Sequence, residues 1–148
     1  MSEIKRILLV EDDPRDVELT MEALGENNLA NEVLLARDGE EALDYLYRRE
    51  DFQQRPVGNP ALVLLDLKLP KVDGIEVLRQ IRKDDQLKMI PVVVLTSSRE
   101  ERDLVDTYQL GVNAYVVKPV NFSEFLIAVK QIGLFWAIIN EPPPGSLK

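Results

Sequence analysis

The stretch LVLLDL at residues 62–67 sets one carboxylate, Asp66, inside a run of large aliphatic side chains. An apolar run this short, bounded by Pro60 and Lys68, is typical of a strand buried on both faces of a parallel sheet. Burying a lone carboxylate there costs several kcal/mol unless something compensates it. The stretch therefore predicts a buried strand over residues 62–65, and Asp66 at its end is better explained by a function than by the fold.

Four other short runs, rich in aliphatic and β-branched side chains, also have the character of strands: residues 7–10, 32–36, 92–95 and 114–117. The segments between the runs carry apolar residues at helical spacing, which form one stripe each. Asp13 precedes a proline and is interpreted as a helix cap, and four further capping residues stand three positions before a glutamate: Asp38, Asp73, Ser98 and Asn121. Alternating strands and helices of this number predict an α/β domain with a doubly wound parallel sheet of the (βα)5 type.

The composition fits one globular domain and narrows the chemistry that it can carry. The 148 residues include 18 Lys+Arg and 26 Asp+Glu, and the formal charge of −8 is a poor match for nucleic acid or an anionic membrane. The chain has no histidine and no cysteine, which excludes a phosphohistidine of its own, thiol catalysis and Cys-ligated zinc. No apolar run is long enough to cross a bilayer and the first residues are not a signal peptide, so we expect a cytoplasmic protein.

Polar side chains follow the predicted strands at their carboxyl ends, where ligands bind in open α/β sheets. Glu11 and Asp12 follow the first strand, Asp66 the third, Thr96 the fourth and Lys118 the fifth. Thr96 and Lys118, taken singly, are also compatible with ordinary turn chemistry. The fifth strand, however, should deliver Lys118 to the same edge as the acids.

A neighbouring first and third strand would bring Asp12 and Asp66 together. Two carboxylates about 4 Å apart repel each other by about 4 kcal/mol at an effective dielectric of about 20, so such a pair calls for a hard cation. Mg²⁺ typically takes one or two carboxylates and adds phosphate oxygens. With Lys118 as a second positive charge and Thr96 as a hydroxyl donor, the set suits phosphoryl transfer to a carboxylate, which yields an acyl phosphate.

Motifs along nearly the whole chain, over residues 5–132, resemble the receiver domain of bacterial two-component response regulators. They are Glu11-Asp12, Asp66 within LDLKLPKVDG at residues 65–74, Thr96-Ser97, Tyr115 and Lys118-Pro119. The resemblance implies the flavodoxin-like strand order 2-1-3-4-5 and a cis peptide bond before Pro119. It also implies a phosphoacceptor switch, with its own Mg²⁺-dependent phosphorylation and dephosphorylation chemistry, and not a classical enzyme.

The same resemblance implies a role for each matching residue. Asp66 is the expected phosphoacceptor, Thr96, Ser97 and Lys118 are expected at the phosphoryl group, and Tyr115 is the expected aromatic switch. The expected metal ligands are Asp12, Asp66, the backbone carbonyl of Lys68, and Glu11 through a metal-bound water, with Mn²⁺ as a substitute for Mg²⁺. The side chain of Lys68, together with Ser98, is expected to control how readily water reaches the acyl phosphate.

Two features go beyond the minimal receiver pattern. They are a long polar connection at residues 48–60 and the apolar ending Phe135-Trp136, followed by a proline-rich tail at residues 141–148. With the absence of an output domain, they resemble the stand-alone regulators paired with cyanobacterial phytochrome histidine kinases. We therefore expect a receiver domain over residues 1–140 with an extended fifth helix, a phytochrome histidine kinase as phosphodonor, and output by protein–protein contact.

Three alternative functions match parts of the pattern. An aspartate-nucleophile phosphatase of the haloacid dehalogenase kind needs an acid two residues after the nucleophile, where this chain has Lys68. A flavin-binding electron carrier needs a phosphate-binding loop after the first strand, where the acids from Glu11 to Asp13 would repel phosphate. A receiver that binds partners without being phosphorylated is the remaining alternative, although every residue that the chemistry needs is present.

The end of the chain has more apolar side chains than one sheet face can cover. The stripe at residues 122–132 suffices for a fifth helix, and Ile127 and the run from Leu134 to Ile139 add to it. Exposed apolar surface of this kind usually marks an interface, most often that of a two-fold dimer. We expect a homodimer through the fourth helix, fifth strand and fifth helix, with Phe135 to Ile139 reaching onto the partner; the alternative is that this extension folds back.

Overall fold

The computed structural model describes residues 6–25, 32–97, 110–118, 120, 123–125 and 127. Several predicted features lie outside these residues: the fourth helix, the caps at Ser98 and Asn121, the peptide bond to Pro119, the segment from Phe135 to Ile139 and the tail at residues 141–148. In the part of the chain that is described, no helix is both long and apolar enough to cross a membrane.

The sheet has the predicted strands in the predicted order. They are β1 (Arg6–Val10), β2 (Glu32–Ala36), β3 (Leu62–Asp66), β4 (Val92–Thr96) and β5 (Ala114–Val117). All neighbours pair in parallel, in the order β2-β1-β3-β4-β5, so the doubly wound arrangement is confirmed. Three strands extend one residue beyond the apolar runs, because Arg6, Asp66 and Thr96 continue the backbone pairing with Glu32, Leu95 and Val117.

The helices begin at the predicted caps. They are α1 (Pro14–Gly25), α2 (Gly39–Tyr47) and α3 (Gly74–Lys83), with a short 3₁₀ turn, η1 (Glu50–Phe52), after α2. Asp38 and Asp73 accept hydrogen bonds from the backbone N–H groups three residues later, at 2.7 and 2.9 Å. The reciprocal half of each capping box does not form as expected, since Glu41 accepts instead from the N–H of Arg37 and Glu76 pairs with Arg79.

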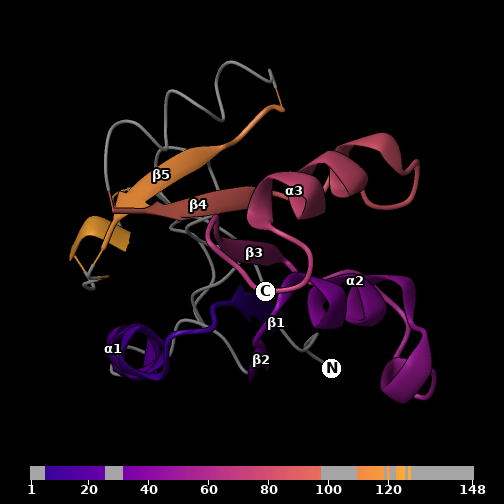
Figure 1. The fold of residues 1–148 in the computed structure, drawn as a ribbon, viewed down its shortest axis with the longest axis horizontal. Helices are drawn as coiled ribbons and strands as arrows, with labels where there is room; N and C mark the ends of the chain where they lie inside the picture. Colours follow the sequence, from indigo (N-terminus) through magenta and orange to yellow (C-terminus); the bar gives the residue numbers. More distant parts are fainter. Residues whose placement is uncertain are drawn as a thin grey trace, which may run out of the picture.

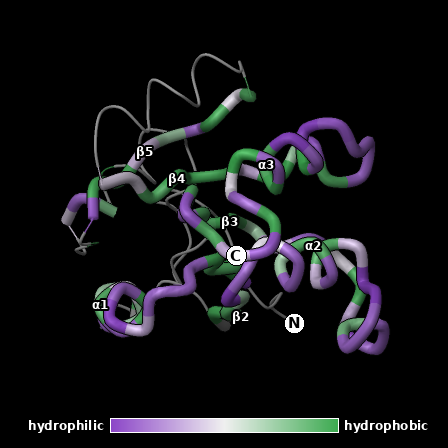
Figure 2. Tube along the Cα trace, in the orientation of Figure 1, coloured by the Kyte–Doolittle hydropathy of each residue, from purple (hydrophilic) through white to green (hydrophobic). Residues whose placement is uncertain are grey.

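Two hydrophobic cores lie on opposite faces of the sheet. Figure 1 shows α2 and α3 on one side of the strands and α1 on the other. Leu8, Val63 and Val94 face α2 and α3, whereas their strand neighbours Leu9 and Leu64 face α1 and a buried phenylalanine at position 125. Figure 2 shows the strands as a largely hydrophobic centre, which is what a parallel sheet covered on both faces requires.

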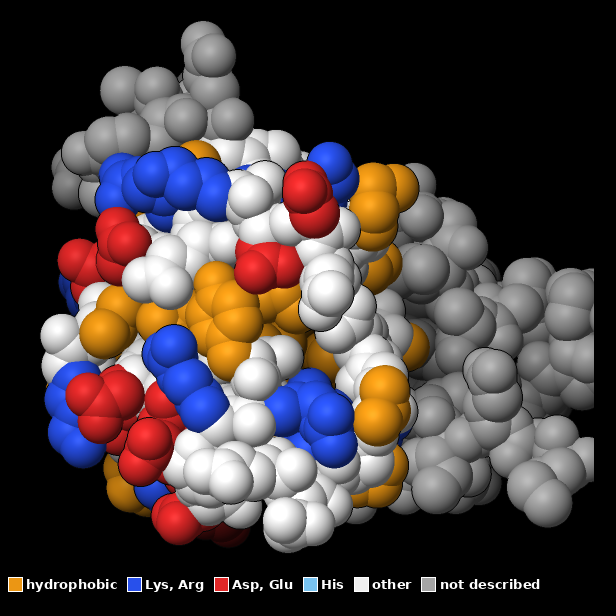
Figure 3. All heavy atoms as spheres, turned by 90° about the vertical axis from the view of Figure 1, so that its right-hand side faces the viewer, with side chains coloured by type: hydrophobic (Ala, Val, Ile, Leu, Met, Phe, Trp, Pro, Cys, Tyr) orange, Lys and Arg blue, Asp and Glu red, His pale blue; other side chains and the backbone are white. Residues whose placement is uncertain are grey.

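The connection at residues 48–60 contains η1 and is held in place by hydrogen bonds of the Arg55 side chain. The Arg55 side chain donates to the carbonyl of Tyr45 at 2.7 Å, to that of Leu46 at 3.4 Å, and to that of Gly58 at 2.9 Å. Its guanidinium also lies 4.1 Å from the centre of the Tyr45 ring. Figure 3 shows this side of the molecule, where basic and acidic side chains surround exposed apolar ones.

Candidate functional site

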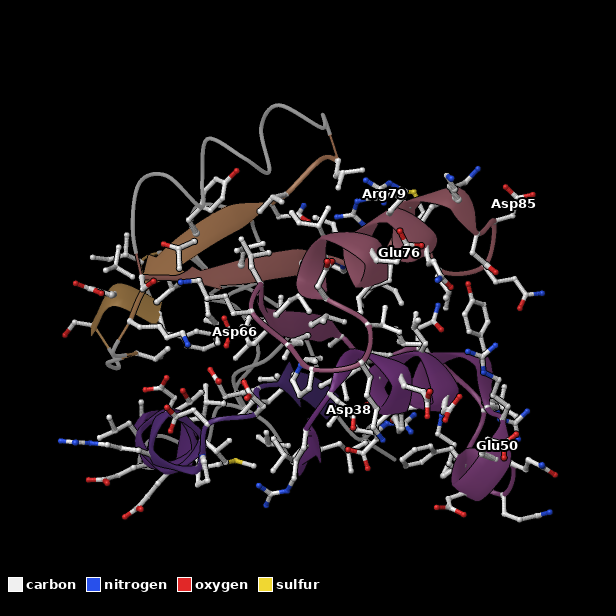
Figure 4. All side chains as sticks on the ribbon, viewed as in Figure 1. Asp38, Glu50, Asp66, Glu76, Arg79 and Asp85 are labelled. Atoms are coloured by element: carbon white, nitrogen blue, oxygen red, sulfur yellow. The ribbon has the colours of Figure 1, made fainter. Side chains whose placement is uncertain are left out.

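The carboxyl ends of four parallel strands meet at one edge of the sheet, and the predicted site residues meet there. Val10 pairs with Leu65, and Asp66 pairs with Leu95, so the residues that follow β1 lie beside the end of β3. Asp66 itself is only 3% exposed. Figure 4 shows it at the end of β3, on the side of the molecule where α1 lies.

Three carboxylates form one cluster at this edge. Glu11, Asp12 and Asp66 each offer an oxygen, and these atoms lie within 4.8 Å of one another. Glu11 is fully buried, whereas Asp12 is exposed, so a bound ion could keep water ligands on its outer side. An all-oxygen set with one open side fits a hard divalent cation such as Mg²⁺ or Mn²⁺.

The buried carboxylate of Glu11 holds its proton more tightly than a free one. Burial, a hydrogen bond with Asp66 and the charge of Asp66 raise the pKa of Glu11 to about 7, against the opposing effect of Lys118. Its other oxygen, Oε2, accepts a hydrogen bond from the N–H of Asp13 at 3.2 Å. Without a cation, a proton on Glu11 therefore reduces the repulsion between the carboxyl groups of Glu11 and Asp66.

Lys118 contacts three carboxylates at once. Its Nζ lies 3.0 Å from Asp16 Oδ2, 3.1 Å from Asp66 Oδ2 and 3.2 Å from Glu11 Oε1. Burial lowers the pKa of Lys118, but Asp16, Asp66 and Glu11 outweigh this and hold the pKa above its usual range. The ammonium is therefore a fixed positive charge beside Asp66.

Asp16 is a contact that the sequence reasoning missed. It lies in the first turn of α1, three residues after the cap Asp13. Acidic residues are common in this position because they interact favourably with the helix dipole. Sequence spacing therefore gave no reason to associate Asp16 with Lys118, from which it is 102 residues distant.

Thr96 and its neighbours occupy the adjacent strand end. Thr96 is buried, and among the described residues its Oγ1 has no hydrogen-bond partner, so the hydroxyl can bind an incoming oxygen. The Lys118 N–H donates to the Thr96 carbonyl at 2.8 Å, which ties these two strand ends together. Ser97 is exposed next to Thr96. Tyr115 is half-buried in the middle of β5 and packs on the core beneath α2 and α3.

The loop after β3 closes the site from the other side. Lys68 is exposed, and its backbone N–H donates to Asp66 Oδ1 at 3.3 Å. A cavity of about 490 Å³, lined by Asp12, Lys68, Asp73 and four apolar residues, opens beside the acidic cluster. Gly74 at the start of α3 is also required here, since a Cβ would lie 2.4 Å from the carbonyl oxygen of Asp66.

The site and the fold together define a class of protein. A family model for the response regulator receiver domain matches residues 7–130, and the chain therefore belongs to this family. The resemblance inferred from the motifs is thereby confirmed, as is the flavodoxin-like strand order.

Among the proteins that this chain resembles, several are named as regulators of phytochromes. Response regulator Rcp1 of Synechocystis sp. is 42% identical over 132 residues, which cover 89% of this chain and 88% of Rcp1. The solved structure of the bacteriophytochrome response regulator RtBRR matches with a TM-score of 0.88 and 62% identity, over 97% of this chain and 87% of that chain. The phosphorylated cyanobacterial phytochrome response regulator RcpA matches with a TM-score of 0.74 and 44% identity, over 91% and 95%. The Mn²⁺-bound form of Rcp1 matches with a TM-score of 0.73 and 41% identity, over 94% and 99%.

Proposed function

We propose that this protein is a response regulator that accepts a phosphoryl group on Asp66 from a phosphohistidine of a histidine kinase. The observation that carries the proposal is the environment of this carboxylate, which is buried, lies in an acidic cluster and contacts a lysine. A carboxylate alone would be too costly to bury there. A divalent cation would offset the negative charge of the carboxylate cluster and of a phosphoryl group bound to Asp66.

In the proposed phosphoryl transfer, the residues at the ends of β3, β4 and β5 have different roles. An oxygen of Asp66 attacks phosphorus, an O–P bond forms, and the P–N bond of the donor breaks with its electron pair left on the imidazole nitrogen. Lys118 and the hydroxyl of Thr96 stabilise the oxygens of the transferring group, and Ser97 stands next to them. Tyr115, three residues before Lys118, is the proposed reporter of the phosphorylated state.

Glu11, Asp12, Asp66 and the carbonyl of Lys68 would hold Mg²⁺, or Mn²⁺ in its place. The bound cation would supply charge neutralisation for the phosphoryl oxygens. The Mn²⁺-bound form of the relative Rcp1 supports this ligand class. Asp12 would be a direct ligand and Glu11 a ligand through a metal-bound water, as the resemblance to the family implies, and both offer an oxygen to the same cluster.

A phytochrome histidine kinase is the proposed phosphodonor. The names of RtBRR and RcpA attach those relatives to a bacteriophytochrome and a cyanobacterial phytochrome, and RtBRR has the higher identity to this chain. The proposal includes a cytoplasmic location, where a kinase would find ATP and Mg²⁺. It includes neither nucleic acid nor a membrane as partner. It includes a homodimer through the fourth helix, β5 and the fifth helix, with residues 135–139 reaching onto the partner.

Labelling of the acceptor tests the proposal. With radiolabelled acetyl phosphate and Mg²⁺, or with a phosphorylated phytochrome kinase, the wild type should take up acid-labile phosphate at one site, and Asp66→Asn should take up none. Asp85→Asn is the matched control, because Asp85 is an exposed aspartate whose ion pair with Lys88 lies at the protein surface. Equal labelling of Asp66→Asn and the wild type would contradict the assignment.

A wild type that no donor labels would favour the alternative of a receiver that binds partners without phosphorylation. Binding of the kinase that is equally tight for the wild type and for Asp66→Asn would then support that alternative.

A further inference from the structure

The ammonium of Lys118 lies among three carboxylates in this structure. It donates hydrogen bonds to Asp16 Oδ2 at 3.0 Å and to Asp66 Oδ2 at 3.1 Å, and Glu11 Oε1 lies 3.2 Å away as an ion-pair contact. A lysine has three N–H donors, so a phosphoryl oxygen on Asp66 competes with these two acceptors for the donors that point toward the site. The acceptor that keeps its hydrogen bond to Lys118 when a phosphoryl group binds determines the position of the ammonium.

Asp16 differs in its surroundings from the other two carboxylates that contact Lys118. Glu11 and Asp66 belong to the cluster that could hold a cation, whereas Asp16 does not. Glu11 and Asp66 are buried, whereas the side chain of Asp16 is 26% exposed. Asp16 comes from α1, and Figure 4 shows Asp66 at the end of β3 on the side where α1 lies. The ammonium is thus held between a buried cluster and an outer carboxylate.

We propose that Asp16 is a positioning residue, which holds the ammonium of Lys118 at the mouth of the site when the inner carboxylates bind a cation and a phosphoryl oxygen becomes a new acceptor of the lysine. The inference rests on the proposed function, because it specifies how Lys118 serves Asp66. A cation held by the acidic cluster would engage Asp66 directly and Glu11 through a water, and Asp16, which lies outside that cluster, would remain as the acceptor that holds the lysine. A phosphoryl oxygen then takes the place of Asp66 Oδ2.

Removing Asp16 has a defined consequence. With Asp66 and Glu11 as its remaining carboxylate contacts, the ammonium should lie deeper in the acidic cluster. There it covers Asp66 Oδ2 and competes with the cation for the same carboxylates. Asp16→Asn should therefore slow the labelling of Asp66 at fixed Mg²⁺ by on the order of tenfold, which is what one charge-assisted hydrogen bond contributes. Asp16→Glu keeps the charge and should restore part of the rate.

Glu18→Gln is the matched control for the loss of charge. Glu18 is an exposed acid on the same helix, two residues after Asp16, and its neutralisation changes the net charge of the protein by the same amount. Its labelling rate should equal that of the wild type. A Glu18→Gln rate that falls as far as that of Asp16→Asn would overturn the inference, because a general charge effect would then explain both.

A double-mutant cycle tests whether Asp16 acts through Lys118. In a Lys118→Ala background, adding Asp16→Asn should leave the residual labelling rate unchanged, because the group that Asp16 positions is gone. Independent, multiplicative losses would overturn the inference.

A second measurement does not depend on phosphorylation. The exchange of the Lys118 ammonium protons with water, followed by nuclear magnetic resonance in the metal-free protein, should be slow in the wild type and in Glu18→Gln, and severalfold faster in Asp16→Asn. The same exchange rate in all three proteins would overturn the positioning role. A wild type that shows this protection but takes up no phosphate would contradict the proposed function alone.

Discussion

Glu11 shows how a single residue links proton binding, metal binding and stability. Its side chain is fully buried beside Asp66, and burial together with this neighbour raises its pKa to about 7. In the unfolded chain the same group titrates near its ordinary value of 4.5. The folded, metal-free protein therefore binds the proton of Glu11 over a pH range in which the unfolded chain has already released it.

The pH dependence of Mg²⁺ binding follows from this difference. The stability that Glu11 contributes is present below about pH 4.5 and is lost as the pH rises toward 7. A cation must displace the proton, so the gain in melting temperature from Mg²⁺ should be several degrees at pH 8 and much smaller at pH 5.5. Thermal unfolding with and without Mg²⁺ at both pH values measures this.

Two variants serve as controls for the metal experiment. Glu11→Gln should flatten the pH dependence of the metal-free melting temperature, since the residue no longer titrates. Asp12→Asn should lose most of the Mg²⁺ gain at pH 8. A Mg²⁺ gain of the same size at pH 5.5 and pH 8, or in Asp12→Asn and the wild type, would show that the cation binds elsewhere.

The two lysines of the site should have separable effects. The ammonium of Lys118 contacts Asp66, whereas Lys68 is exposed and reaches Asp66 with its backbone N–H. Lys118→Ala should still be labelled but should not reach the active conformation. Lys68→Ala should also be labelled, with an altered half-life of the acyl phosphate. Labelling followed by a chase without donor measures uptake and half-life in both variants, and the nuclear magnetic resonance spectrum of the phosphorylated protein measures the conformational change. A Lys68→Ala protein that takes up no label would contradict the division.

The sequence predicted those site residues whose positions are determined by the ends of the strands. Asp66, Thr96 and Lys118 follow apolar runs directly, so parallel pairing alone brings them to one edge. Asp16 was not predictable, because its contact depends on how α1 packs against the sheet and on the length of a lysine side chain. The same holds for Gly74, whose role appears only when the α3 backbone is seen against Asp66.

At the scale of elements, the apolar runs predicted the strands, because a strand that is buried on both faces of a sheet needs apolar side chains on both. The polar ends of β3 and β4 were missed, since backbone hydrogen bonds continue regardless of side-chain polarity. The connection at residues 48–60 carried no periodic pattern, and its order comes from several hydrogen bonds, of which the Arg55 side chain makes the most. Such hydrogen bonds depend on the three-dimensional path of the loop, and a local pattern in the sequence does not predict them.

Arg55 should therefore stabilise the fold without serving the site. Its guanidinium satisfies carbonyls at the end of α2 and stacks on Tyr45. Arg55→Ala should lower the free energy of unfolding by about 2 kcal/mol, measured by urea denaturation, with labelling of Asp66 unchanged. Arg49→Ala is the control, since Arg49 makes an exposed ion pair with Asp44 and should cost less than about 1 kcal/mol. Equal losses in the two variants would argue against an organising role for Arg55.

For the whole molecule, β5 is the strand where an interface is to be expected. It lies at the edge of the described sheet, next to β4. Val117 on β5 is 50% exposed, and Ile127, in the segment after it, is 56% exposed. Apolar side chains that remain exposed beside a sheet edge are typical of a surface that a partner covers.

A homodimer through this surface is the last prediction. Sedimentation at micromolar concentration should give a dimer for the wild type, and Ile127→Glu should weaken association because it places a charge in the apolar contact. Val57→Glu should remain dimeric, since Val57 is 76% exposed but lies in the connection after α2. Emission of Trp136, the single tryptophan, should change with dilution in the wild type and in Val57→Glu. If the segment from Phe135 to Ile139 instead folds back on its own subunit, the wild type will sediment as a monomer with constant emission, both unmodified and carrying a phosphoryl mimic.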